Sequence, residues 1–145
     1  MSVIKRVFLP IFGLSLMLTS CTSSNSIEGA WQVIDFSVSM KMEDDWLENA
    51  KAMAIQYKYK FDSDGTVSIS YPESLAQNGD LVDRLEDGSL QIQGTYSMPN
   101  DSTLYLMGRG GDTATFGIEF ISNYRMSMSQ DIPNLGVQTF TLDRM

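Results

Sequence analysis

The sequence has no histidine, a single cysteine and few basic residues, and each shortage excludes a class of function. Without histidine the chain cannot build a Cys/His metal site, a serine triad or a cysteine–histidine nucleophile, and one cysteine cannot form an internal disulfide. Only 10 lysine and arginine side chains stand against 18 aspartate and glutamate side chains. Nucleic acid and anionic membrane surfaces are therefore disfavoured partners. We expect a protein that is not an enzyme, with no catalytic residue, no metal site and no cofactor.

The N-terminal apolar stretch, residues 7–18, is too short to favour a membrane span. Two basic residues precede it and small residues follow it, an order typical of a signal peptide. The sequence Leu-Thr-Ser-Cys, which ends at Cys21, resembles the lipobox of bacterial lipoproteins. This resemblance implies that residues 1–20 are a lipoprotein signal peptide and that Cys21 carries the lipid.

The lipid implied for Cys21 makes a membrane the first expected partner. The next residue is Thr22 rather than aspartate, which resembles outer-membrane sorting. We therefore predict a lipid-anchored protein of the cell envelope, held at the outer membrane and facing the periplasm or the surface. Residues 21–27 form a polar tether, and residues 28–145 suit one domain with one modest core.

The predicted domain contains eight segments in which apolar and polar residues alternate, a pattern typical of an all-β protein. They cover residues 31–40, 56–61, 66–71, 89–98, 103–107, 113–122, 124–129 and 137–144. Short turns and longer loops alternate between them. The longer loops are residues 41–55, 72–88, 108–112 and 130–136. An up-and-down barrel places all short turns at one end and all long loops at the other. We therefore predict an eight-stranded up-and-down antiparallel barrel with a closed base and an open mouth.

The first long loop carries a helical pattern. Acidic residues open it, where they complement the helix dipole, and four apolar residues then recur on one face. These four are Trp46, Ala50, Met53 and Ala54. We predict one lid helix between strands one and two, at the mouth. Two functions stay open for Trp46 and Met53, which either seal the core at that end or belong to a lid that opens for a ligand.

Motifs at both ends of the domain resemble a known family. Gly29-Ala30-Trp31 resembles the G-x-W signature of lipocalins, and Arg144 ends the last strand, where lipocalins place a basic side chain across that tryptophan. With residues 59–67 and 94–96, these motifs are similar to the small lipocalin-like lipoproteins of Bacteroidota-type bacteria. The resemblance implies an eight-stranded, calycin-type barrel with Gly29, Trp31 and Arg144 as its structural signature.

The contact between Trp31 and Arg144 follows from barrel closure. Strand eight pairs antiparallel with strand one, so the end of one meets the start of the other. Trp31 does not share the alternation of Ile34 and Phe36, which predicts a bulge in strand one between them.

The alternation also assigns the interior of the barrel, which we expect to be mostly filled because so many inward residues are large. The inward residues are Ile34, Phe36, Val38, Tyr57, Tyr59, Phe61, Val67, Ile69, Tyr71, Leu90, Ile92, Tyr96, Leu104, Leu106, Phe116, Ile118, Phe120, Met126, Met128, Phe140 and Leu142. A pocket would then be shallow and near the mouth. Its candidate ligand contacts are Met40, Trp46, Met53, Tyr57, Tyr71, Met107 and Met128. The alternative for the methionines is that they fill gaps in a small core.

The charge of the mouth discriminates between ligands. Its four loops hold 11 acidic and four basic residues, so a fatty acid or a lipid phosphate is repelled. We expect binding of a small neutral or cationic apolar ligand. The alternative is a protein-interaction or structural module of the cell envelope, with a filled barrel, an envelope protein as its partner and no ligand.

Overall fold

The computed structural model describes residues 26–76 and 82–145. Several predictions fall outside these described residues. They are the signal peptide over residues 1–20, the lipidated Cys21, the tether up to residue 25, and the part of the second long loop at residues 77–81.

The described residues form nine strands, one α-helix and one short 3-10 helix. The strands are β1 (Gly29–Val38), β2 (Lys58–Phe61), β3 (Thr66–Tyr71), β4 (Asp83–Arg84), β5 (Leu90–Asn100), β6 (Thr103–Gly108), β7 (Thr113–Phe120), β8 (Arg125–Ile132) and β9 (Gly136–Arg144). The helix α2 (Asp44–Ala54) lies between β1 and β2, as predicted, and the 3-10 helix η1 (Glu73–Leu75) follows β3.

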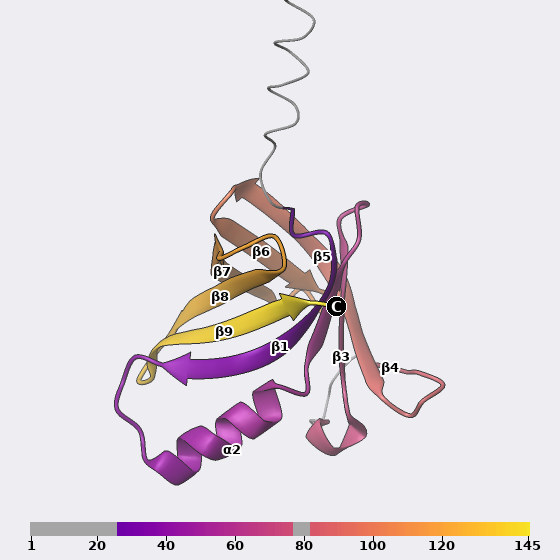
Figure 1. Cartoon of the computed structure of the whole chain (residues 1–145). Coiled ribbons are helices and arrows are strands. Elements are labelled where there is room, and N and C mark those ends of the chain that lie inside the picture. The colour runs from indigo at the N-terminus through magenta and orange to yellow at the C-terminus, as the bar shows by residue number, and fades with distance from the viewer. Residues whose placement is uncertain (1–25, 77–81) are drawn as a thin grey trace, which may run out of the picture.

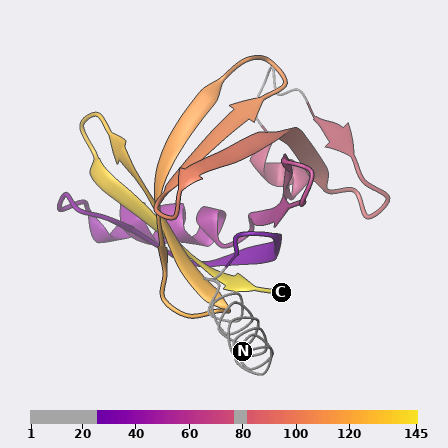
Figure 2. The ribbon, with the colours of Figure 1, turned by 90° about the horizontal axis from the view of Figure 1, so that it is seen from above.

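Eight of the strands close into an antiparallel barrel (Figure 1), which confirms the predicted fold. Within the ring, β1 pairs with β2, β2 with β3, and β3 with β5, and each strand from β5 onward pairs with the next. The pairing of β9 with β1 closes the ring. The two-residue β4 lies on β5 outside this ring. Viewed along the barrel, the strands surround a central space, and α2 is seen beyond them at the far end (Figure 2).

The predicted bulge lies in β1. Its register with β9 shifts between Val33 and Asp35, so the inward alternation of Trp31 and Val33 passes to Phe36 and Val38. The assignment of Ile34 to the interior is wrong, because Ile34 stands in the bulge without a partner in register. Val33, with 1% of its surface exposed, takes that place in the core.

The interior of the barrel is filled by large side chains, as the alternation predicts. Several of them have less than 2% of their surface exposed, and they come from β1, β2, β6, β8 and β9. These are Trp31, Val33, Phe61, Leu104, Met126, Met128 and Leu142. Space for a candidate ligand is therefore limited to the ends and the wall of the barrel.

Trp31 and Arg144 close the base of the barrel. They are partners in register, and the Arg144 guanidinium carbon lies 4.2 Å from the centre of the fully buried Trp31 ring, which confirms the predicted contact. The indole nitrogen of Trp31 donates a 2.8 Å hydrogen bond to the carbonyl of Ile27. Gly29 has a φ of +118°, and a Cβ there would lie 2.8 Å from Arg144 Nη1. Glycine is thus required beside this pair.

Three carbonyl groups complete the environment of the Arg144 guanidinium. It donates to Ser26 at 2.8 Å, to Glu28 at 2.5 Å and, through Nε, to Asn123 at 3.0 Å. Arg144 therefore ties the first described residues and the turn between β7 and β8 to the end of β9. The fork of donors on a guanidinium suits such a multiple contact.

Two of the predicted long loops are in fact tight turns. β8 extends to Ile132 and β9 begins at Gly136, where Asn134 and Gly136 take the positive φ angles of 72° and 75° that a three-residue connection requires. Between β6 and β7, the amide of Gly108 bonds to the carbonyl of Asp112 at 2.8 Å. The two predicted loops that are long in the structure are the one that contains α2 and the one that follows β3.

Substitution of Gly94 tests how closely the backbones of β5 and β6 approach each other in the barrel wall. Gly94 on β5 pairs with Gly108 on β6, and a Cβ at Gly94 would overlap the Met107 carbonyl and lie 3.3 Å from Gly108 Cα. Because these are backbone atoms, Gly94→Ala is expected to lower the free energy of unfolding by about 1 to 3 kcal/mol. Gly108→Ala is the matched control, since its nearest atom is 3.9 Å away. Urea denaturation of both variants measures the difference, and equal stability of the two would contradict the close approach.

Candidate ligand-binding site at the barrel mouth

Helix α2 packs on the mouth end of the barrel through one narrow face. Ala54 is buried, and Leu47 and Ala50 pack against the core. The predicted apolar face is confirmed for the two alanines, whereas Trp46 and Met53 lie at its edge with 37% and 49% of their surfaces exposed. The two side chains therefore do not seal the core.

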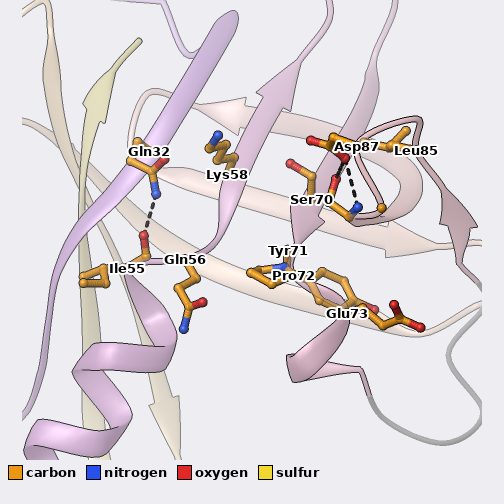
Figure 3. Close-up of a pocket in the computed structure, with 12 residues that line it drawn as sticks. Gln32, Ile55, Gln56, Lys58, Ser70, Tyr71, Pro72, Glu73, Leu85 and Asp87 are labelled. Carbon is orange, nitrogen blue, oxygen red and sulfur yellow. Dashed lines mark hydrogen bonds between the residues drawn. The ribbon is translucent and has the colours of Figure 1, made fainter.

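The C-terminal end of α2 is fixed to β1 by polar contacts. The Gln32 amide nitrogen donates to the carbonyl of Ile55 at 2.6 Å (Figure 3) and lies 3.1 Å from that of Tyr57. The Lys51 ammonium lies 2.8 Å from the carboxylate of Asp35. This hydrogen bond lowers the pKa of Asp35, so its carboxylate stays ionised at neutral pH. The position of the helix is thus defined by both packing and hydrogen bonds.

A pocket of about 620 Å³ lies between α2 and the mouth ends of β1, β2 and β9. Five of its ten lining residues are aromatic and none is charged. The lining residues are Phe36, Trp46, Asn49, Ala50, Met53, Ala54, Tyr57, Tyr59, Gln138 and Phe140. The rings of Phe36 and Phe140, partners in register, lie 5.2 Å apart. This mouth pocket has the size and the apolar lining of a small-molecule site.

Tyr59 places a neutral hydroxyl in the mouth pocket. Burial, and secondarily the nearby Tyr57, raise the pKa of Tyr59 to about 12, so it stays protonated at neutral pH. Within the described residues the Tyr59 hydroxyl makes no hydrogen bond. Every fully buried side-chain nitrogen or oxygen of the described residues has a hydrogen-bond partner, so the Tyr59 hydroxyl is not one of the fully buried atoms. The Tyr59 hydroxyl is therefore accessible from the pocket that it lines.

The structure brings together three of the seven candidate ligand contacts, Trp46, Met53 and Tyr57. Tyr71 stacks near Tyr57, with ring centres 5.4 Å apart, but it lines a different pocket. Met40 is 48% exposed at the end of β1 and does not line the mouth pocket.

Met107 and Met128 are wrong as ligand contacts of this pocket. Met128 is fully buried and pairs with Ile118 and Phe140, so it belongs to the filled core. Met107 is 51% exposed and points outward, because its position on β6 alternates with the inward Leu106. The core role of Met128 follows the alternative that methionine fills gaps.

Sequence reasoning missed several residues of the mouth pocket. Phe36, Tyr59 and Phe140 were expected to face inward but were not assigned to the site, although their places at the mouth ends of strands could have indicated it. Asn49 lies one turn after Trp46 on α2, a spacing that also places it on the pocket side. Gln138 carried no signal, because a polar residue was not expected on the inner face.

A second pocket, also of about 620 Å³, lies on the outer wall beside β2 and β3 (Figure 3). Its lining is mixed: the charged residues Lys58, Glu73 and Asp87 stand beside apolar ones such as Pro72 and Leu85. The carboxylate of Asp87 already accepts hydrogen bonds from Ser89, which lower its pKa, and Glu73 is paired with Arg84 at 2.7 Å. These acids hold the turn around β4 in place.

The described residues contain no group of three or more acidic or cysteine side chains placed to hold a metal ion. The mouth pocket combines a concave, mainly apolar surface that has no charged side chain with accessible polar groups. A scan against models of protein families and a search of curated proteins both find no match for this chain.

Proposed function

We propose that the protein is a lipid-anchored, lipocalin-like binding protein of the cell envelope, which takes a small neutral or cationic apolar ligand in the mouth pocket. The observation that carries the proposal is the pocket of about 620 Å³ with five aromatic and no charged lining residues. It lies on a rigid closed barrel, and binding sites commonly lie on the long connections of such scaffolds.

The charges around the mouth support this ligand class. Three of the four basic side chains of the predicted mouth loops are paired with acids: Lys51 with Asp35 at 2.8 Å, Arg84 with Glu73 at 2.7 Å, and Arg109 with Asp83 at 2.6 Å. These cations are therefore already neutralised. An anionic head group would meet an acidic rim, which disfavours fatty acids and phospholipid phosphates.

The direction of the chain supports the anchoring part of the proposal. The first described residues enter at the base, at the opposite end of the barrel from α2 (Figure 1). Four residues lie between Cys21 and Ser26, so the two residues are at most about 18 Å apart along an extended chain. A lipid on Cys21 would therefore hold the base near the membrane and leave the mouth facing away from it. Among the residues that the structure describes, no helix is long and apolar enough to cross a membrane.

The filled interior favours one second candidate, an interaction module of the cell envelope that binds no ligand. Met40, Trp46 and Met53 expose apolar surface at the mouth, where a protein partner could cover them. The two candidates differ in whether the pocket is occupied by a small molecule. Native mass spectrometry of the purified lipidated protein tests this, because a small apolar mass that co-purifies supports the binding protein.

The double variant Trp46→Ala, Met53→Ala tests the mouth pocket itself. With the neutral fluorescent probe N-phenyl-1-naphthylamine, we expect a loss of affinity of about tenfold or more, since both side chains line the pocket. Because both are partly exposed, the loss of stability is expected to be about 1 kcal/mol. Probe titration and thermal melting measure the two effects.

The matched control is the variant Tyr105→Ala, Met107→Ala. It removes an aromatic and a methionine of similar exposure, 47% and 51%, from the outer face of β6. Its probe affinity should equal that of the wild type. If the mouth variant keeps its affinity while its melting temperature collapses, α2 is a structural plug. If the wild type does not bind the probe at all, the interaction module replaces the binding protein.

A further inference from the structure

We propose, on the basis of the binding function above, that the mouth pocket selects an organic cation, namely a protonated amine carried on an apolar body. The apolar lining alone would accept neutral molecules equally well. Three features of the site favour a cation: its aromatic rings, its unpaired acceptor groups and its acidic rim.

The rings are the first feature. Three of the five aromatic side chains of the pocket are Trp46, Tyr57 and Tyr59, and no lysine or arginine lines the pocket. The faces of aromatic rings attract cations, most strongly those of tryptophan, and the attraction increases when the cation is desolvated. A ring-lined pocket without a positive side chain is therefore more favourable for an ammonium group than for a carboxylate.

The polar atoms of the pocket are the second feature. The amide nitrogen of Gln138 is 3.4 Å from the side-chain oxygen of Gln130, which leaves the carbonyl oxygen of Gln138 as an acceptor. The neutral Tyr59 hydroxyl and the amide of Asn49 add further acceptors. An ammonium group has three donors and no acceptor. The acceptors of the pocket can therefore receive the hydrogen bonds that an ammonium group donates.

The rim is the third feature. On α2 and its N-terminal flank, Glu43 lies one helical turn before Trp46, and Asp45 lies one turn before Asn49. Both acids are exposed, and the nearest basic residue of the helix, Lys51, is paired with Asp35. A concentration of negative charge at the entrance of an apolar pocket attracts cations and repels anions.

Three probes with eight carbon atoms each test the selectivity: n-octylammonium, 1-octanol and octanoate, titrated into the wild-type protein by calorimetry at neutral pH. We expect n-octylammonium to bind roughly threefold to thirtyfold more tightly than 1-octanol, the range that a cation–π contact supplies. Octanoate should bind most weakly. Octylammonium and octanol carry the same octyl chain, so the ratio of their affinities reports the head group.

Two variants locate the selectivity. Trp46→Leu keeps an apolar side chain but removes the ring, so the ratio of octylammonium to octanol affinity should fall severalfold. Tyr59→Phe keeps the ring but removes the hydroxyl, so octylammonium should again lose severalfold in affinity. Tyr105→Leu, on the outer face of β6, is the control, and its ratio should not change. Thermal melting verifies that each variant is folded.

The outcomes separate this inference from the function on which it rests. Equal affinity for octylammonium and octanol overturns the selectivity for cations but leaves a protein that binds a neutral apolar ligand. Tighter binding of octanoate overturns the selectivity and the proposed ligand class together. Failure of all three probes to bind overturns both proposals. A wild-type ratio that survives Trp46→Leu and Tyr59→Phe unchanged also overturns the assignment to this pocket.

Discussion

Replacement of Trp31 with alanine is expected to lower the free energy of unfolding by about 3 to 5 kcal/mol. The side chain is fully buried, its indole nitrogen bonds to the carbonyl of Ile27 at 2.8 Å, and its ring faces the guanidinium of Arg144 at 4.2 Å. Domains of this size are stable by about 5 to 15 kcal/mol, so the variant would lose a large part of its stability. Urea denaturation followed by circular dichroism measures the loss without relying on tryptophan fluorescence.

A variant of Arg144 tests how much the guanidinium beside Trp31 contributes to stability, and a variant of Arg109 is its control. Arg144→Lys keeps the charge but removes the fork that serves the carbonyls of Ser26, Glu28 and Asn123, so it should also destabilise the barrel. Arg109→Lys, in the exposed pair with Asp83, is the control and should change stability by less than about 0.5 kcal/mol. A loss below about 1 kcal/mol for Trp31→Ala would show that this contact does not hold the base together.

The sequence predicts the barrel because an alternation of period two records which face of each strand is buried. Trp31, Phe61 and Leu142 lie inside, where their alternation or the lipocalin resemblance placed them. The bulge in β1 was predicted because Trp31 and Phe36 lie out of phase. The residue that stands in the bulge was not predicted. The change of phase shows only that a bulge exists, whereas the exchange of Ile34 for Val33 in the core depends on the register with β9.

The loops were less predictable because their form depends on residues outside their own sequence. The connection after β8 looked long because Gln130 puts a polar residue at the inward position that follows Met126 and Met128, yet pairing with Gln138 on β9 carries the strand through it. On α2, the helical period predicted one apolar face but not its angle to the barrel. Leu47 turned toward the core in place of Trp46, and this rotation left the tryptophan beside an open pocket.

The candidate site was predicted in part for the same reason. Residues of one element, such as Trp46 and Met53, share a face that the sequence records. The contribution of Phe140 and Gln138 comes from β9, nearly a hundred residues away, and depends on barrel closure. Met128 was misassigned because proximity to the mouth along a strand does not show how far the core extends.

Loss of the lipid at residue 21 is expected to convert the protein from a membrane-bound to a soluble form. Stable anchoring needs more than one acyl chain, and the lipobox resemblance implies at least two on Cys21. We expect the wild type to stay in washed membranes and to incorporate a labelled fatty acid. Cys21→Ala should incorporate none, so fractionation and labelling together measure the effect.

The control for this experiment separates the lipid from the signal peptide, because Cys21→Ala alone can keep an uncleaved apolar stretch over residues 7–18. Residues 22–145 are therefore also expressed behind an ordinary cleavable secretory signal peptide. This chain keeps the acidic domain, which repels anionic membrane surfaces, so it should appear wholly in the soluble fraction. Its mouth pocket should bind N-phenyl-1-naphthylamine like the lipidated protein, since the pocket lies beside α2, at the end of the barrel opposite the first described residues. Retention of this lipid-free chain in washed membranes would contradict lipid anchoring and indicate a protein receptor for the barrel instead.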